Sequence, residues 1–231
     1  MRYMDRLLLI LADAGLELVP PEISRHPAVV NNAKRRGKKP KEVLLDVSLH
    51  YTAMKTLKDR WKRGRPDIVH VSLLIAQDSL LNKLGRLETY IHTYQRKVIE
   101  ISPEMVVPRN YIRFVGLAEQ LLLVGRVPPD TGKPLAYIHR KALRDLIKEK
   151  RVSKTFRLDD KAVAVKPRNL AKMIVEEKYP ALIIGAFQQG DFSEEVESVE
   201  AEVYSIFDEP LPAWSVLSHV LALVTDELGV P

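Results

Sequence analysis

The stretch TFRLDDKAVAVKPRNLAKMIVEEKYPALIIGAF, residues 155–187, holds the pattern that decides the fold. A short apolar run at 155–158 is followed by a segment of helical spacing at 168–177 and then by a second apolar run at 181–187. Short apolar runs that alternate with helical segments are typical of parallel strands joined by crossover helices. We therefore expect an α/β protein whose mainly parallel sheet is covered by helices on both faces.

The same alternation extends outward from this stretch in both directions. Apolar runs predict strands at 7–12, 44–47, 87–94, 97–101 and 203–207. Helical spacing, first-turn prolines and capping residues predict helices from Pro27 to Gly37, at 49–59 with Ser48 as the N-cap, and at 66–77, 110–123, 136–150 and 213–228. Three prolines and a glycine predict a loop at 126–134.

Composition limits the class of protein. The chain has 231 residues, of which 46% are apolar, so it can bury a sizeable core. We expect one domain over residues 1–231, with a basic insertion or extension around residues 25–105. The absence of cysteine excludes disulfides, thiolate zinc sites and cysteine nucleophiles, and no histidine and aspartate spacing indicates a metal site. The apolar run at 7–12 is too short to span a membrane, so we expect a soluble cytoplasmic protein without a membrane partner.

Charge is distributed unevenly along the chain. Residues 1–120 carry 21 Lys and Arg against 13 Asp and Glu, whereas no Lys or Arg follows Lys178 and ten acidic residues do. Two dense clusters, KRRGKKPK at 34–41 and KTLKDRWKRGR at 55–65, account for much of the excess. Nucleic acid is the natural partner of such a basic half, and Trp61 could stack on a base. A merely solvated basic surface is the alternative.

The stretch PRNYIRF at 108–114 adds a third basic feature. Arg109 and Arg113 are four residues apart and share one face of the predicted helix. Two guanidinium groups on one face can grip adjacent phosphates, although the isolated pattern is weak.

A glycine-containing strand end is the first candidate cofactor loop. IIGAFQQGDF, residues 183–192, carries Gly185 at the end of an apolar run and Gly190 beside Asp191. It matches no phosphate-binding glycine motif, and the acidic residues Glu194, Glu195, Glu197 and Glu200 follow it. A cofactor with a positive centre, such as S-adenosylmethionine, would be tolerated there. From these residues alone, a structural strand end is equally plausible.

A proline-containing loop is the second candidate. YSIFDEPLPAWSVLSHV, residues 204–220, joins a predicted strand to the last predicted helix. Two prolines restrict the loop, and an apolar loop of this kind suits a nucleoside. Without other observations, a plain strand-to-helix connection is the preferred interpretation.

Taken in order, several stretches resemble one family. ILADAGLELVP, RRGKKPKEVLLDVSLHYTAM, KRGRPDIVHVSLL, PRNYIRFVGLAEQLL, IIGAFQQGDF and EPLPAW are similar, over nearly the whole chain, to the nucleolar essential protein 1 family, also called essential for mitotic growth 1. The resemblance implies a pseudouridine N1-methyltransferase of small-subunit ribosomal RNA. It also implies the SPOUT fold, a C-terminal trefoil knot, a homodimer and S-adenosylmethionine, with ribosomal proteins as possible partners. The compact length looks archaeal.

The resemblance also assigns candidate residues to the cofactor and to RNA. The candidate cofactor residues are Leu158, Ile184, Gly185, Ala186, Phe187, Gly190, Asp191, Tyr204, Ser205, Ile206, Phe207, Leu211, Ala213, Trp214 and Ser215. For RNA, the resemblance points to Arg65, Arg109 and Arg113, and we add Arg35, Arg36, Lys38 and Arg63 of the two basic clusters together with His50 as candidate RNA-binding residues. A further RNA-binding arginine of some family members corresponds to Val106 here, and the stretch before Leu158 matches the family poorly.

The catalytic candidates are Arg65, Asp67 and Asp78. The N1 atom of pseudouridine must lose a proton to become a good nucleophile, so a base and a cation would both help. A carboxylate beside an arginine has a lowered pKa, so we interpret Asp67 mainly as an organiser of Arg65. Asp78, at the other end of the predicted helix, is the candidate for proton removal. A methyltransferase acting on another RNA position and a non-catalytic ribosome-assembly factor are the competing hypotheses.

Overall fold

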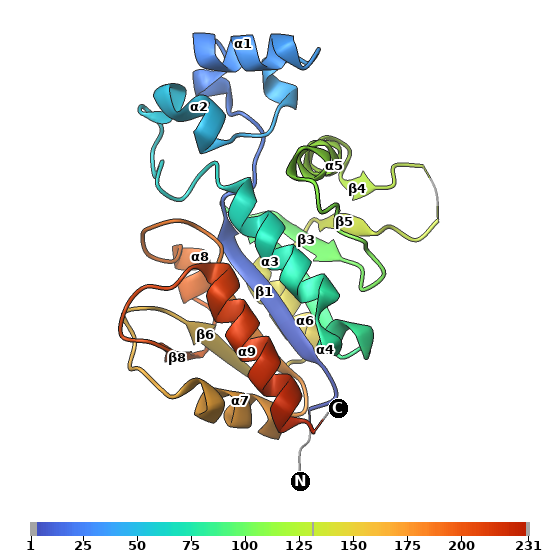
Figure 1. Ribbon diagram of the computed structural model, residues 1–231, viewed down its shortest axis with the longest axis vertical. Helices are drawn as coiled ribbons and strands as arrows, with labels where there is room; N and C mark the ends of the chain where they lie inside the picture. Colours follow the sequence, from blue (N-terminus) through green and yellow to red (C-terminus); the bar gives the residue numbers. More distant parts are fainter. Residues whose placement is uncertain (1–3, 131, 230–231) are drawn as a thin grey trace.

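The computed structural model describes residues 4–130 and 132–229 and is built on one eight-stranded sheet (Figure 1). The strand order is β4-β5-β3-β2-β1-β7-β6-β8, in which neighbouring strands from β2 to β8 are parallel and those from β2 to β4 are antiparallel. The strands are β1 (Leu7–Ala14), β2 (Leu87–Thr93), β3 (Val98–Ile101), β4 (Arg126–Val127), β5 (Ala136–His139), β6 (Lys154–Leu158), β7 (Pro180–Gly185) and β8 (Glu202–Tyr204). The expected mainly parallel sheet is confirmed.

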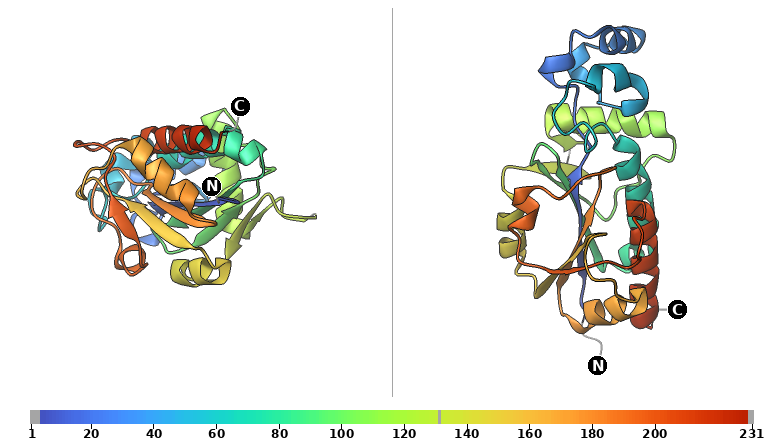
Figure 2. Two further views of the ribbon diagram at one scale, coloured as in Figure 1. Left: turned by 90° about the horizontal axis from the view of Figure 1, so that it is seen from below. Right: turned by 90° about the vertical axis from the view of Figure 1, so that its left-hand side faces the viewer.

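Strand β1 lies at the centre of the sheet and is buried on both faces. Leu7, Leu9 and Leu11 pack into a core shared with α3 (Pro66–Asp78), α5 (Tyr111–Val124), α7 (Pro167–Glu176) and α9 (Ala213–Glu227). The alternate residues Leu8 and Ile10 pack against α6 (Leu143–Lys150) and α8 (Glu194–Glu197) on the other face. Side chains alternate across a strand, so this continuous apolar run requires cover on both faces, which Figure 2 shows.

Residues 19–57 form a helical subdomain with a core of its own, at the top of Figure 1. It contains η1 (Pro21–Ile23), α1 (Pro27–Arg35), η2 (Pro40–Glu42) and α2 (Val47–Met54). The basic insertion or extension expected from the sequence covers more of the chain, around residues 25–105, than this subdomain does. In the structure, α3, α4 (Leu80–Lys83), β2 and β3 pack with the main sheet instead.

Buried polar contacts attach the helical subdomain to α5. The carboxylate of Glu119, which is fully buried, accepts hydrogen bonds from Arg36 at 2.5 and 2.8 Å and from Lys38 at 2.5 Å. The hydroxyl of Tyr111 donates to Asp46 at 2.5 Å. The subdomain is therefore fixed against the helix whose first turn follows Arg109.

Four sequence predictions of secondary structure are wrong, wholly or in part. Residues 44–47 form no strand, because Leu44 makes only an isolated bridge with Leu18, and the side chain of Asp46 caps α2 by accepting from the Ser48 N–H at 2.8 Å. The helix predicted at 49–59 therefore begins and ends earlier. The segment 136–150 contains β5 before α6, because residues 136–139 pair with β3. The loop predicted at 126–134 includes the short strand β4.

Candidate functional site

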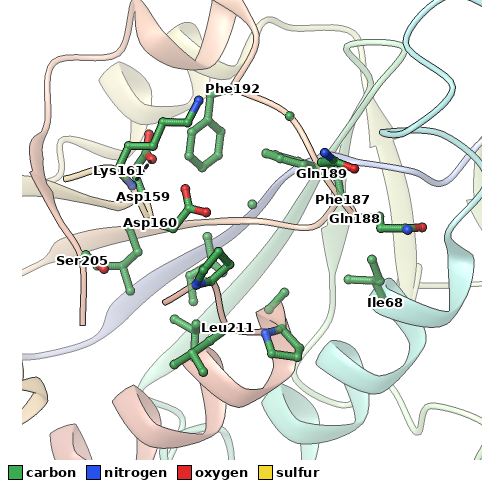
Figure 3. A pocket seen from close by; sticks show the side chains of 18 of the residues that line it. Ile68, Asp159, Asp160, Lys161, Phe187, Gln188, Gln189, Phe192, Ser205 and Leu211 are labelled. Carbon is green, nitrogen blue, oxygen red and sulfur yellow. Dashed lines mark hydrogen bonds between the residues drawn. The ribbon is translucent and has the colours of Figure 1, made fainter. Parts of the chain in front are cut away.

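A cavity of about 720 Å³ lies at the carboxyl ends of β6, β7 and β8 (Figure 3). Its walls are the loop after β6, the loop after β7, the proline-containing loop after β8, and the first turn of α9. The carboxyl ends of parallel strands are the usual place for a ligand in an open α/β sheet. The volume lies within the range of small-molecule sites, which is about 300–1,000 Å³.

Most of the candidate cofactor residues line this cavity. Those that do are Leu158, Ile184, Gly185, Phe187, Gly190, Asp191, Ser205, Ile206, Phe207, Leu211, Ala213 and Trp214. Ala186, Tyr204 and Ser215 do not. Ala186 is fully buried and its N–H donates to Ala12, and the Tyr204 hydroxyl bonds to Glu202, so neither side chain turns into the cavity.

Several lining residues were not predicted. Asp159, Asp160 and Lys161 follow β6 directly, in the part of the chain where the family resemblance is poorest. Two adjacent carboxylates after a buried strand were the signal that could have identified this loop. The remaining lining residues are Arg65, which was predicted for catalysis and RNA, Ile68, and residues of the two candidate loops that were not named individually: Gln188, Gln189, Phe192, Glu209, Pro210, Pro212 and Val216.

The cavity has an acidic lining. Asp159, Asp160, Asp191 and Glu209 contribute carboxylates. Lys161 pairs with Asp191 across two of the loops, which lowers the pKa of Asp191 through a hydrogen bond. Arg65 is the other cation of the lining. The balance favours a ligand with a positive centre over one rich in phosphate.

The acidic residues identified from the sequence are not the ones in the cavity. Glu194, Glu195, Glu197 and Glu200 are absent from its lining, and α8 packs on the opposite face of the sheet with α6. Glu195 accepts a hydrogen bond from the Leu143 N–H at 3.0 Å. The expected acidic environment is present, but it comes from the loops after β6, β7 and β8.

The glycines of the loop after β7 allow close packing around the cavity. A Cβ atom at Gly185 would lie 2.8 Å from the Phe187 ring and 3.3 Å from the Phe192 ring. Gly190 has a φ of 112°, a conformation that side chains disfavour. Both residues line the cavity, so the shape of this wall depends on the absence of side chains there.

Arg65 stands at the edge of the cavity. Its Nε and Nη2 atoms donate to both oxygens of Asp67 at 2.8 and 2.7 Å, and its Nη1 donates to the amide oxygen of Gln188 at 2.7 Å. Its backbone N–H donates to Gly15 at 3.0 Å. The hydrogen bond with Asp67 raises the pKa of Arg65, although partial burial opposes this. The guanidinium is therefore permanently charged and held in one orientation.

The PRN stretch is anchored from two sides. The ring of His70 on α3 contacts the Pro108 carbonyl oxygen through Nε2 at 2.7 Å. Asn110 caps α5 by accepting from the Arg113 N–H at 3.2 Å. Arg109 and Arg113 are both exposed. The helix that begins with Pro66 therefore connects Arg65 at its N-cap to the loop that carries Arg109.

Four of the candidate RNA-binding residues are engaged inside the protein. Arg63 is buried and donates to both oxygens of the fully buried Glu17 at 2.7 Å, and His50 is fully buried. Arg36 and Lys38 hold Glu119. Arg63 and His50 are buried, whereas Arg36 and Lys38 are partly exposed beside their partner Glu119, and the assignment of these four residues to RNA stays a prediction. Arg35, in contrast, is exposed on α1.

The structure does not bring Asp78 to the cavity. It is the last residue of α3, its side chain is 65% exposed, and Lys83 lies 4.0 Å away. A helix rises about 1.5 Å per residue, which puts Asp78 roughly 16 Å from Asp67 along the axis. Within one chain, Asp78 cannot remove a proton beside Arg65.

Asp13 is a buried acid that the sequence analysis did not use. It ends the straight part of β1 with a φ of 49°, and its carboxylate accepts from the Ser193 N–H at 2.5 Å and the Ser193 hydroxyl at 2.7 Å. Lys62 and His92 lie 3.6 and 3.4 Å away. Burial alone would raise the pKa of Asp13, but His92 and Ser193 lower it below its ordinary value. The carboxylate joins the loop after β7 to the segment before Arg65.

We expect the Asp13→Asn substitution to lower the free energy of unfolding by about 2 kcal/mol at neutral pH, since it removes charge-assisted hydrogen bonds. A lowered pKa means that the carboxylate stabilises the fold above about pH 3.9 and loses this effect as the pH falls through the lower, folded-state pKa. Urea unfolding from pH 7 to pH 3 should therefore show the difference between wild type and variant shrinking. Asp78→Asn is the exposed control, and a difference independent of pH would contradict the assignment.

Comparison with known proteins agrees with this geometry. A family model described as EMG1/NEP1 methyltransferase matches residues 9–224. This chain belongs to the EMG1/NEP1 methyltransferase family. The ribosomal RNA small subunit methyltransferase Nep1 of Staphylothermus marinus is 50% identical over 96% of each chain, and that of Thermococcus sibiricus is 46% identical over 93% of this chain and 96% of its own.

A solved member of the EMG1/NEP1 family has the same fold. The crystal structure of Archaeoglobus fulgidus Nep1 bound to S-adenosylhomocysteine superposes with a TM-score of 0.84, at 38% identity, covering 99% of this chain and 100% of the other. The S-adenosylhomocysteine belongs to that structure. The α/β architecture described above is therefore the family's fold.

Two kinds of site are absent from residues 4–130 and 132–229. No group of three or more histidine, aspartate or glutamate side chains could hold a metal ion there. No helix in the same residues is long and apolar enough to cross a membrane.

Proposed function

We propose that this protein transfers a methyl group from S-adenosylmethionine to the N1 nitrogen of a pseudouridine in small-subunit ribosomal RNA. The observation that carries this proposal is the acidic cavity at the carboxyl ends of β6, β7 and β8, with the fixed cation Arg65 at its edge. Membership of the EMG1/NEP1 family and the names of the archaeal relatives support methyl transfer to ribosomal RNA.

The residues present fit S-adenosylmethionine. Apolar side chains such as Ile206, Leu211 and Trp214 offer a surface for the adenine ring. The carboxylates of Asp159, Asp160 and Asp191 surround the cavity with negative charge, which suits a sulfonium and disfavours a phosphate group. The relative from Archaeoglobus fulgidus, whose fold matches, was solved with the demethylated product S-adenosylhomocysteine.

We assign RNA contacts to the exposed cations. Arg65 lines the cavity, Arg109 and Arg113 are exposed at the start of α5, and Arg35 with Lys34 lies on the exposed surface of α1. Cations that neutralise phosphates give affinity that falls with salt. The family resemblance further leads us to propose a homodimer, a C-terminal trefoil knot, contact with ribosomal proteins during small-subunit assembly, and a cytoplasmic location.

Bound S-adenosylmethionine would supply an electrophilic methyl group. In the transfer, the bond from N1 to the methyl carbon forms, the bond from sulfur to that carbon breaks, and the N1 proton leaves to solvent. Arg65 is placed to stabilise the negative charge that develops on the base as the proton departs. Both oxygens of Asp67 are held by Arg65, so we assign Asp67 to the positioning of Arg65.

Methyl-labelled S-adenosylmethionine and two matched RNA hairpins test the proposal. One hairpin carries uridine and the other pseudouridine at the same loop position. We expect label only in the pseudouridine hairpin, because only that base presents a nitrogen at N1 that can accept the methyl group. Asp78→Asn should retain the turnover of the wild type, since Asp78 lies at the far end of α3.

Each other outcome has a defined meaning. Label in both hairpins would favour a methyltransferase acting on another position, such as a ribose hydroxyl. Binding of RNA without label in either hairpin, together with no binding of S-adenosylmethionine, would favour a non-catalytic assembly factor. Loss of activity in Asp78→Asn would show that this residue reaches a reacting group by a route that one chain does not provide.

A further inference from the structure

One hydrogen bond joins the cavity wall to the cation that faces RNA. The amide oxygen of Gln188 accepts from Nη1 of Arg65 at 2.7 Å, across 123 residues of sequence. Gln188 belongs to the loop after β7, between Phe187 and Gly190, which also line the cavity. Figure 3 shows Gln188 on the same side of the cavity as Ile68, in the first turn of the helix that Arg65 caps.

The donors of Arg65 are divided between two kinds of partner. A guanidinium has five N–H donors in a fixed plane. Two donate to Asp67, which lies two residues away on the same segment, and one donates to Gln188. Asp67 lies on the same segment as Arg65 and would move together with it. Gln188, in contrast, connects Arg65 to the cavity wall formed by the loop after β7. The remaining N–H donors are those available to a substrate.

The tip of the loop that carries Gln188 is exposed, and its other side-chain partner is Lys161, which pairs with Asp191. Gln188, Gln189, Gly190 and Asp191 are all exposed, and Gly190 has a positive φ. A ligand in the cavity that contacts this loop would restrict its conformations. The same loop carries Gln188, the acceptor that orients Arg65. The entropic cost of ordering this loop would therefore be shared between binding of the cofactor and binding of RNA.

We propose that Gln188 is a positioning residue that couples occupancy of the cofactor cavity to RNA binding by Arg65. A bound cofactor restricts the loop after β7 and so maintains the hydrogen bond between Gln188 and Arg65 that the structure shows, which keeps Arg65 in the orientation that RNA requires and tightens RNA binding. This inference rests on the proposed function, since it needs both ligands. Thermodynamic linkage requires that RNA tightens cofactor binding by the same factor.

The coupling factor is the quantity to measure. S-adenosylhomocysteine and the pseudouridine hairpin form a non-reacting pair, so both dissociation constants can be measured by calorimetry or fluorescence anisotropy, alone and in the presence of the other ligand. We expect each ligand to tighten the other by about fivefold or more in the wild type. In Gln188→Leu, which has no acceptor for Arg65, the factor should fall to below twofold.

Three variants separate positioning from a general effect on the loop. Gln188→Glu keeps an acceptor oxygen and should keep the coupling, even if its charge weakens RNA binding. Gln189→Leu changes the neighbouring cavity residue, and whatever it does to either affinity, the coupling factor should remain that of the wild type. In an Arg65→Lys background, Gln188→Leu should cause no further change in the factor.

The outcomes distinguish this inference from the proposed function. If S-adenosylhomocysteine or RNA fails to bind alone, the proposed function is wrong. If both bind and the wild-type factor is one, or if Gln188→Leu keeps the full factor, only the role of Gln188 is overturned.

Discussion

Glu119→Ala is expected to lower the free energy of unfolding by about 3 kcal/mol, because it removes one partner of a buried ion pair. Glu119 is fully buried and its carboxylate accepts from Arg36, from Lys38 and from the Leu44 N–H at 2.9 Å. The substitution leaves two neighbouring cations without their counter-charge and an N–H without an acceptor. Arg36 and Lys38 are partly exposed and can recover some hydration, so we place the effect at the lower end of the range for buried pairs.

The two tryptophans allow this effect to be located. Trp61 follows the helical subdomain and Trp214 lines the cofactor cavity, so a Trp214→Phe background leaves fluorescence that reports on the segment next to the subdomain. Urea unfolding followed by Trp61 should show the loss in Glu119→Ala. Gln120→Ala, an exposed substitution on the same helix, should be within 0.5 kcal/mol of wild type, the usual range of surface substitutions.

Glu119→Gln separates charge from hydrogen bonding. The amide oxygen can still accept from Leu44, so we expect a smaller loss than in Glu119→Ala. A Glu119→Ala protein as stable as the wild type would show that Arg36 and Lys38 do not depend on this carboxylate, and would return them to the set of cations available to RNA.

The parallel sheet could be predicted from the sequence because its strands are buried on both faces. Apolar runs at 7–12, 155–158 and 181–187 cannot be placed on a half-exposed sheet, so helices must cover both sides. The predictions that failed concern short segments. At 44–47 a capping aspartate outweighs local strand propensity, and at 136–139 pairing with β3 outweighs helical spacing.

The cofactor cavity could be predicted in its apolar part, since strand ends and a proline-containing loop leave a local pattern. Its charged part could not. Four carboxylates line the same cavity only because β6, β7 and β8 end at one edge of the sheet; they belong to Asp159, Asp160, Asp191 and Glu209. The sequence analysis therefore expected an acidic environment but assigned it to glutamates that follow on the chain and lie on another face.

For a related reason, a basic cluster in the sequence does not show how many of its cations have partners inside the protein. A run of cations does not show which of them face buried carboxylates that lie far away in sequence. Arg63 finds Glu17, 46 residues away, and Arg36 finds Glu119, 83 residues away. Both acids are isolated in the sequence and fully buried in the fold, so the pairs become visible only in three dimensions.

Gly15→Ala is expected to reduce methyl transfer by about 100-fold, because a displacement of roughly 1 Å in a positioned group can cost that much. Gly15 lies directly after β1, where its carbonyl accepts from the Arg65 N–H and its N–H donates to Ala186 at 3.3 Å. A Cβ atom there would be 2.7 Å from the Lys62 carbonyl oxygen and 3.0 Å from the Arg65 nitrogen. Both are backbone atoms, so the segment from Lys62 to Arg65 must move as a unit.

Displacement of this backbone affects the position of Arg65 more directly than it affects the packing of the core. Displacing this backbone breaks the hydrogen bond that fixes Arg65 beside β1 and separates its guanidinium from Gln188, so RNA affinity and turnover should fall together. We expect the free energy of unfolding to fall by about 1–3 kcal/mol, the usual cost of overpacking. Single-turnover transfer to the pseudouridine hairpin and urea unfolding measure the two effects.

Gly116→Ala is the matched control for Gly15→Ala. Gly116 lies within α5 and a Cβ atom added there meets nothing within 4 Å. Alanine is favoured over glycine in a helix by about 1 kcal/mol, so this variant should keep its turnover and be as stable as the wild type or slightly more so. Normal turnover in Gly15→Ala would mean that the close contact between β1 and the Lys62–Arg65 segment does not position the arginine, and the assignment of Arg65 as a fixed cation would then be wrong.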